Sequence, residues 1–261
     1  MSMVYLDSLR NNIRRRTETD YIMPIWLPFV PLILVLLGVM IFIVSILGGM
    51  MPLMGRPFRR PGIILLAMPL VSLMSIIGAI INLYVLYKWI KRRNEHFKRQ
   101  LMVYRDIMSL LREISRERGI DISTQIALIN REISEAEIEE TEKSAVLWII
   151  LVLLIGIVIL YVYHFLTKDF FVHERREDRI VTGIQEALGI LGTRFAYRRY
   201  YEIPHRNTIL YIILTIITLG IFSLYWVYVI TKDPNEHFLE QRKWEDAVVS
   251  ALEQLALPPP P

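Results

Sequence analysis

The sequence predicts an all-α integral membrane protein, with four transmembrane helices in two hairpin-like halves and amphipathic, coiled-coil-like helices outside the lipid. Three observations support this class. Hydrophobic residues make up 54% of the 261 residues and charged residues 21%, so the two kinds must be concentrated in separate blocks. Four long apolar blocks contain no charged side chain. One sequence at the end of an apolar block occurs twice.

The repeated sequence, called the join below, marks the end of an apolar block, where the chain is expected to pass from lipid to water. Leu83–Phe97 aligns without a gap on Leu224–Phe238, and the Leu-Tyr, second Tyr, Lys and Asn-Glu-His-Phe positions coincide. A blurred third copy contains Leu160-Tyr161, Thr167-Lys168-Asp169 and His173, at a constant offset from the last copy. The chain therefore has the pattern of a duplicated membrane-anchored unit.

The first two spans come early in the chain. Residues 1–22 form a basic segment, and residues 23–90 form the first transmembrane hairpin. Its first apolar run, Met23 to Gly48, is roughly 39 Å long as a helix, which is enough to cross a hydrocarbon core of about 30 Å. A short turn leads to the second run, Gly62 to Tyr87.

Residues 91–143 are predicted to form a charged cytoplasmic helical hairpin that breaks at Gly119. Its second helix carries an apolar seam at alternating four- and three-residue spacing, which is typical of helix pairing. The pairing residues are Ile122, Ile126, Ile129 and Ile133. The hairpin either stands off the membrane by itself or pairs with another chain.

The third predicted transmembrane helix occupies residues 144–167, with the apolar run Ala145–Tyr163. The fourth occupies residues 207–232, with the apolar run Thr208–Ile230. Both runs lack charged side chains and are long enough, as single helices, to cross a bilayer.

Two polar segments complete the second half. Residues 168–206 form an amphipathic connector, and residues 233–261 form a C-terminal helix and a proline tail. The apolar stripe of the connector either lies in the headgroup layer or packs on the other soluble helices. This stripe consists of Ile180, Ile184, Leu188, Leu191 and Phe195.

Each copy of the join places aromatic rings before basic residues, as amphipathic rings prefer the lipid–water boundary. Asn94 and Asn235 are then expected to cap the following helix, with Glu95 and Glu236 in its first turn. The predicted membrane-interface residues are Tyr84, Tyr87, Trp89, Tyr161, Tyr225, Trp226 and Tyr228.

A metal site is the alternative interpretation of the repeat. Glu95-His96 and Glu236-His237, brought together by pseudo-twofold symmetry, would offer two imidazoles and two carboxylates to a divalent ion. Adjacent residues point about 100° apart on a helix, so one copy does not easily present both to one ion. We therefore assign no metal, catalytic or cofactor-binding residue. The remaining histidines are expected to be packed or interfacial: His164, His173 and His205.

Four consecutive spans would place both clear copies of the join on one side, with the N- and C-termini cytoplasmic. The basic residues that follow the second span favour this orientation under the positive-inside rule. The basic connector 168–206 would then face outward, against that rule. Either the connector is an exception, or one apolar block dips without crossing.

The segment Leu214–Tyr228 resembles a family of small bacterial and archaeal membrane proteins of unknown function, whose spans carry a Thr-x-Gly-aromatic-x-x-Tyr-Trp-x-Tyr signature. Here Ile221 intervenes between Gly220 and Phe222. The first copy of the join keeps Leu83, Tyr84 and Tyr87 without the Thr-x-Gly part. The resemblance implies a helical membrane fold and brings no activity.

We expect a non-enzymatic membrane scaffold or accessory subunit that uses helices 95–140 and 235–257 to bind partners. No block carries a nucleophile–base pair or a Gly-rich phosphate loop, and the lack of cysteine excludes disulfides, thiolate catalysis and iron–sulfur clusters. The expected partners are the lipid bilayer and either further copies of the chain or a larger membrane complex. We expect no cofactor, nucleic acid or identifiable small-molecule substrate.

The alternative is a small transporter or channel built on the internal duplication. The absence of charged residues within the four apolar blocks argues against it. The balance of Ile, Arg and Glu also suits a hyperthermophile.

Overall fold

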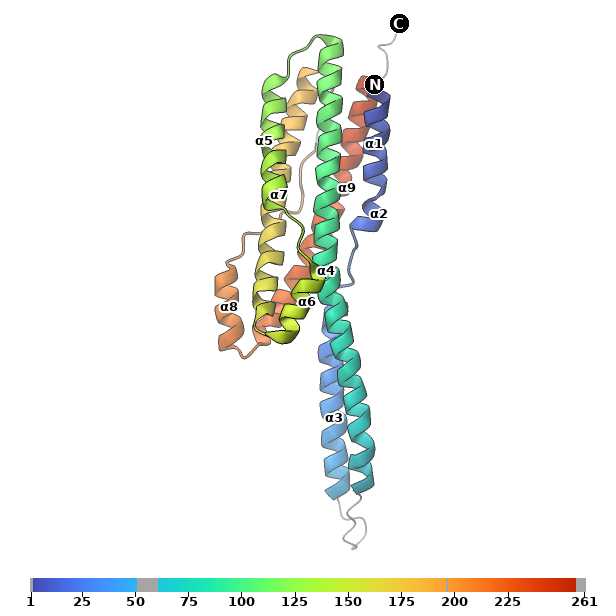
Figure 1. Ribbon diagram of the computed structural model, residues 1–261, viewed down its shortest axis with the longest axis vertical. Coiled ribbons are helices and arrows are strands. Elements are labelled where there is room, and N and C mark those ends of the chain that lie inside the picture. The colour runs from blue at the N-terminus through green and yellow to red at the C-terminus, as the bar shows by residue number, and fades with distance from the viewer. Residues whose placement is uncertain (1, 51–60, 196, 257–261) are drawn as a thin grey trace. The chain divides into compact units, whose positions relative to one another are not determined.

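The computed structural model describes residues 2–50, 61–195 and 197–256, and this part of the chain is helical without strands, which confirms the all-α class (Figure 1). The proline tail and the turn between the first two predicted spans lie outside the described residues. The helices in chain order are α1 (Ser2–Arg14), α2 (Arg16–Thr19), the 3₁₀ turn η1 (Leu27–Phe29), α3 (Val30–Met50), α4 (Pro61–Arg118), α5 (Ser123–Glu139), α6 (Ala145–Leu154), α7 (Val158–Ile190), α8 (Thr208–Ile217) and α9 (Ile221–Ala256).

The chain divides into two compact units. Pro24–Lys88 form the first, called the hairpin unit, and Met1–Met23 with Trp89–Pro261 form the second, called the bundle unit. In the hairpin unit α3 packs on the first part of α4, where a Cβ at Gly78 would make an ordinary van der Waals contact, at 3.6 Å, with the backbone of Pro31.

Within the described residues, two helical segments are long and apolar enough to cross a membrane, Leu27–Leu47 and Ala67–Arg118. The first two predicted spans thus correspond to candidate spans of the structure. Helix α4 continues far beyond its apolar part because no glycine or proline occurs between Gly78 and Gly119. Its residues from Trp89 on belong to the bundle unit, and it ends where Gly119 takes a φ of 64°.

The predicted third span is not a single helix. Helix α6 ends after ten residues, the chain turns at residues 155–157, and α7 runs back beside α6. The ring of Trp148 lies 5.4 Å from that of Tyr161 and 5.2 Å from that of Phe165, so the two legs are antiparallel. We call this element the α6–α7 hairpin.

The predicted fourth span turns back in the same way. Helix α8 also has ten residues, and the chain reverses where Leu219 and Gly220 take positive φ values of 50° and 92°. The ring of Tyr211 then lies 5.0 Å from that of Phe222. This is the α8–α9 hairpin, and the expectation of four straight spans is therefore not confirmed.

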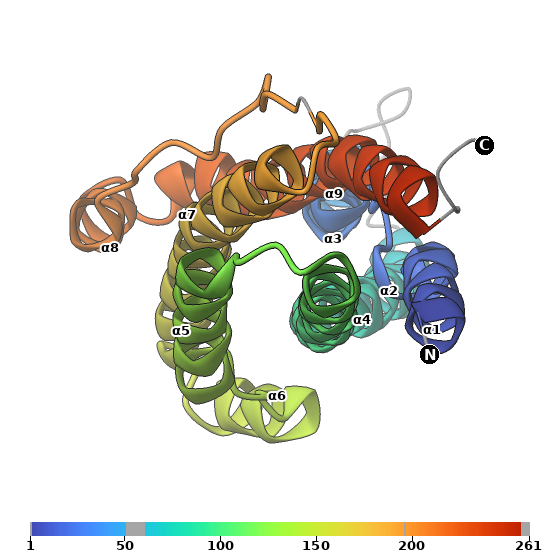
Figure 2. The same cartoon turned by 90° about the horizontal axis from the view of Figure 1, so that it is seen from above.

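One hydrophobic core holds the bundle unit together, with buried residues from α1, α4, α5, α7 and α9. The seam of α5 belongs to this core, and α5 packs on α7 (Figures 1 and 2). A Cβ at Gly183 of α7 would lie 2.9 Å from Ile129, so this glycine permits the close approach. The predicted pairing face is thus covered within the chain.

The apolar stripe of the connector is also in this core. Ile180, Ile184 and Leu188 are fully buried on α7, and Leu191 and Phe195 are buried just after it. The stripe packs on the other soluble helices, which is the second of the two predicted alternatives. It is not available to the headgroup layer.

Candidate metal centre

Three histidines meet inside the bundle unit, one from each of its long helices. His96 lies on α4, His173 on α7 and His237 on α9. One ligand nitrogen of each lies within 4.8 Å of the others, and the Nε2 atoms of His96 and His237 are 3.3 Å apart. Each side chain is at most 1% exposed. The cluster is therefore closed to solvent.

The internal repeat explains why these histidines meet. His96 and His237 occupy the same position of the join, and His173 occupies it in the blurred third copy. Helices α4 and α9 run parallel, because Trp89 donates to Thr231 and Arg99 further along donates to Glu245. Helices α7 and α9 are likewise parallel, so equivalent positions of all three copies converge at one depth.

Each imidazole is oriented by a carboxylate. The Nδ1 atoms of the three histidines lie 2.9 Å from Asp20, 2.9 Å from Glu140 and 3.0 Å from Glu174, in chain order. An ionised carboxylate only accepts hydrogen bonds, so each Nδ1 carries a hydrogen, and in a neutral imidazole Nε2 is then the atom that is able to bind a metal. Nε2 of His173 is buried and has no hydrogen-bond partner.

An arginine supports each of these carboxylates. Arg99 donates to Asp20 at 2.7 Å, Arg176 donates to Glu140, and Arg199 lies 3.4 Å from Glu174. Burial alone would raise the pKa of each carboxyl, but the imidazole and the guanidinium together hold the pKa below its ordinary value. The same chain of histidine, carboxylate and arginine thus occurs three times.

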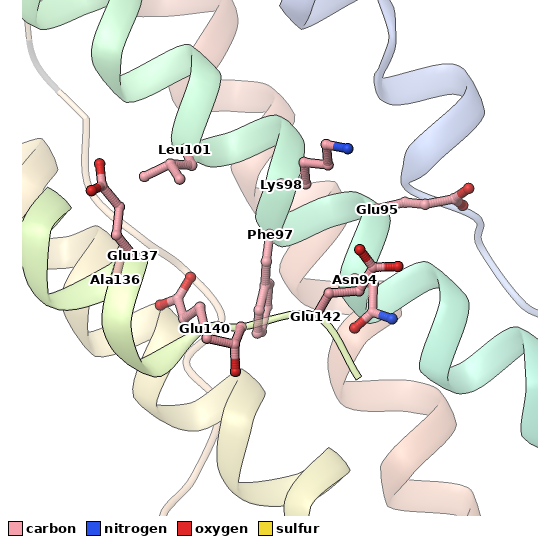
Figure 3. A pocket seen from close by; sticks show the side chains of 10 residues that line it. Asn94, Glu95, Phe97, Lys98, Leu101, Ala136, Glu137, Glu140 and Glu142 are labelled. Carbon is pink, nitrogen blue, oxygen red and sulfur yellow. The ribbon is translucent and has the colours of Figure 1, made fainter. Parts of the chain in front are cut away.

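Phenylalanine rings enclose the histidines. Phe97 stacks on His173 with a centroid separation of 4.2 Å, and Phe238 lies 4.5 Å from His96. A pocket between α4 and the end of α5 is lined by Phe97 and Glu140, which both contact His173 (Figure 3).

The donor set fits a divalent transition metal of the zinc type. Three imidazole nitrogens suit such an ion, and nitrogens bound to one tetrahedral zinc at about 2.0–2.1 Å would lie about 3.3–3.4 Å apart. The separation between His96 and His237 has this value, so only the third nitrogen must move closer. In metal sites, the ring nitrogen of a ligating histidine that does not bind the metal usually donates a hydrogen bond, often to a carboxylate, as the Nδ1 atoms do here.

Arginines pair with the carboxylates beside His237. Arg199 is shared by Glu174, Glu177 and Asp178, and Arg175 also lies 3.9 Å from Glu174 and 3.6 Å from Asp178. Glu177 is fully buried, and Glu174 contacts His237 directly.

The structure separates the four residues considered for a metal. It brings His96 and His237 together, whereas Glu95 points away from Phe97 and Glu140 and pairs with Lys91 (Figure 3). Glu236 is half-buried outside the cluster. His173 was expected only to be packed or interfacial. The signal that it belongs to the cluster is its place in the third copy of the join, where it aligns with His237 at the same offset as the other matching residues.

The two join asparagines are not helix caps, because α4 and α9 run through them. Asn235 binds both backbone groups of Met23, at 3.1 and 2.7 Å. Asn94 binds both backbone groups of Lys143, at 3.2 and 2.7 Å. Each asparagine therefore fixes the segment that leads into an apolar hairpin.

Two of the predicted interface aromatics are buried. Trp89 donates its indole N–H to Thr231, and Trp226 donates to Thr167, so both rings pack between helices rather than at lipid. The tyrosines differ: Tyr87 is half-buried, while the others are 37–55% exposed. Those exposed tyrosines are Tyr84, Tyr161, Tyr225 and Tyr228.

Comparison with known proteins gives one match. A family model described as a domain of unknown function, DUF4234, matches residues 206–252. The matched segment contains α8 and most of α9, including His237. No curated protein and no solved structure matches the chain.

Proposed function

We propose that this protein is a membrane-anchored, non-enzymatic protein that binds one divalent transition-metal ion, zinc above others, at His96, His173 and His237. The observation that supports it is the convergence of three buried imidazoles, each held at Nδ1 by a carboxylate and each directing Nε2 to the centre. The ion would bond to the three Nε2 atoms.

The closed setting favours a structural ion over a catalytic one. Three imidazoles leave the fourth position of a tetrahedral ion to water, as in catalytic zinc sites, but phenylalanines surround these imidazoles and bulk solvent does not reach them. One ion would cross-link α4, α7 and α9, which come from widely separated parts of the chain. Metal binding is then part of the folding free energy of the bundle unit.

The metal-locked bundle is the proposed scaffold. The candidate spans Leu27–Leu47 and Ala67–Arg118 would anchor it in the lipid bilayer, with the bundle and both termini on the cytoplasmic side. Binding to further copies of the chain or to a membrane complex would use its outer surface, because the α5 seam is already covered by α7.

Metal analysis of the purified chain tests this proposal. Wild type, carrying an affinity tag without histidine, is extracted in mild detergent and analysed by inductively coupled plasma mass spectrometry. We expect about one equivalent of metal per chain, and after exchange with Co²⁺ the visible absorption of a tetrahedral site. His173→Ala should lose both signals.

The chain supplies a matched control. It has five histidines, and the variant His164→Ala/His205→Ala removes the two outside the cluster. This variant should keep the wild-type metal content and cobalt spectrum. Folded wild-type protein that contains no metal and gives no cobalt absorption would refute the proposal.

A further inference from the structure

The two short hairpins expose apolar side chains at their tips. At the α6–α7 tip, Leu154 is 75% exposed and Ile157 is 69% exposed. At the α8–α9 tip, Ile217 is 70% exposed and Leu219 is 94% exposed. Large apolar side chains gathered at protruding tips indicate contact with an apolar medium.

The length of the legs identifies how far the hairpins reach. Helices α6 and α8 have ten residues each, so each leg is about 15 Å long. The hydrocarbon core of a bilayer is about 30 Å thick. A hairpin of this length reaches the middle of the bilayer and returns to the side from which it entered.

The backbone of the α8–α9 tip is suited to a medium without water. Every backbone N–H from Thr218 to Ser223 donates a hydrogen bond within the tip. The two hydroxyls of the tip also donate inward, from Thr218 to Leu214 O and from Ser223 to Gly220 O. Unpaired backbone groups are costly in hydrocarbon, whereas a turn exposed to water has no need of such complete pairing.

Both hairpins have a basic and aromatic rim at their base. Because α7 and α9 are parallel, the hairpins lie at the same end of the bundle unit (Figure 1). Lys168 and Lys232 stand on the returning helices, whereas Lys143 before α6 and Arg206 before α8 pair with Asp169 and Asp233. Lys168 is exposed, so it meets anionic lipid headgroups when the tips enter the lipid.

We propose that the α6–α7 and α8–α9 hairpins insert side by side into a single leaflet, with the acyl-chain layer of that leaflet as their partner. The polar segments 91–143, 168–206 and 233–256 then all lie on the same side of the membrane. This arrangement places the basic connector with the other basic segments, as the positive-inside rule requires. It does not depend on metal binding.

Single cysteines distinguish insertion from crossing, because the natural chain contains no cysteine. The variants Glu117→Cys, Tyr200→Cys and Gln254→Cys place exposed reporters in the three polar segments. A membrane-impermeant maleimide is applied to sealed vesicles of either orientation. We expect all three reporters to react in the same orientation. Reaction of Tyr200→Cys in the orientation opposite to that of Glu117→Cys would overturn the proposal.

A second measurement locates the tips. An environment-sensitive fluorophore on Leu154→Cys or Ile217→Cys should be quenched severalfold more by nitroxides near the acyl-chain ends than by aqueous iodide, whereas the fluorophore on Tyr200→Cys should show the reverse. Quenching of the tips by iodide would place them in water. Protection from both quenchers would place them against protein, such as a second copy of the chain. Either outcome would overturn leaflet insertion.

Discussion

Removal of one imidazole by His173→Ala is expected to abolish the metal dependence of the stability of the bundle unit. The lost side chain supplies the Nε2 atom that has no protein partner and also the ring that stacks on Phe97. The substitution thus costs some packing energy even without metal. The informative quantity is therefore the difference in melting temperature between the metal-loaded and the chelator-treated forms of each variant.

The expected size of this difference follows from linkage. An ion present at 1,000 times its dissociation constant stabilises the folded state by about 4 kcal/mol. For a unit of this size, each kcal/mol shifts the melting temperature by about 2–4 °C, so chelation should lower the wild-type melting temperature by about 8–16 °C. In His173→Ala the difference should be close to zero.

The assay is thermal unfolding in detergent followed by circular dichroism, with His164→Ala as the matched control. His164 is half-buried and bonds Thr208 outside the cluster, so its loss should leave the wild-type metal difference intact. Two results would refute the reasoning: no effect of chelation on wild type, or the same metal-dependent difference in His173→Ala as in wild type.

Three further predictions concern the buried charges. Glu140→Gln should weaken metal binding about 10–100-fold, measured by competition with a chromophoric chelator, whereas the exposed Glu137→Gln should not change it. Arg199→Met leaves three carboxylates without their shared guanidinium and should cost about 3–5 kcal/mol in denaturant unfolding; equal loss in the exposed Arg198→Met would contradict this. Burial raises the pKa of Glu245 to about 7, so the folded state retains a proton that the unfolded state releases near pH 4.5. The associated stability is complete below about pH 4.5 and is lost as the pH rises through 7. Wild type should therefore lose stability relative to Glu245→Gln between pH 5 and pH 8, and parallel pH profiles would show that the group does not titrate in this range.

The sequence predicted those features that depend on local pattern. Apolar runs identified the hairpin unit and the buried seam that contains Ile129 and Ile133, and the glycine at position 119 identified the break between α4 and α5. The repeat also identified positions that meet in space, because equivalent residues of parallel helices lie at the same depth. His173 follows the same rule, although its copy of the join is degenerate.

The remaining features depend on contacts between distant segments. A straight span has the same apolar composition as a hairpin whose first leg is a ten-residue helix such as α8, and the reversal near Gly220 depends on the backbone of a few residues. The sequence around Trp226 does not show whether its indole faces lipid or donates to the hydroxyl of Thr167, as it does in the structure. Likewise, Asp20 lies far from His96 along the chain, so its role in orienting that imidazole emerges only from the fold.

The hydrogen bonds between Asn235 and Met23 have a consequence for folding during synthesis. Met23 is translated more than two hundred residues before its partner, and the hairpin unit emerges in between. Arg92 depends on the same late arrival, since it donates to the Ile230 carbonyl that Pro234 leaves without its usual helical donor. The amino-terminal segment therefore makes this contact only after α9 has been synthesised. A chain truncated before α9 lacks the partners of both Met23 and Arg92.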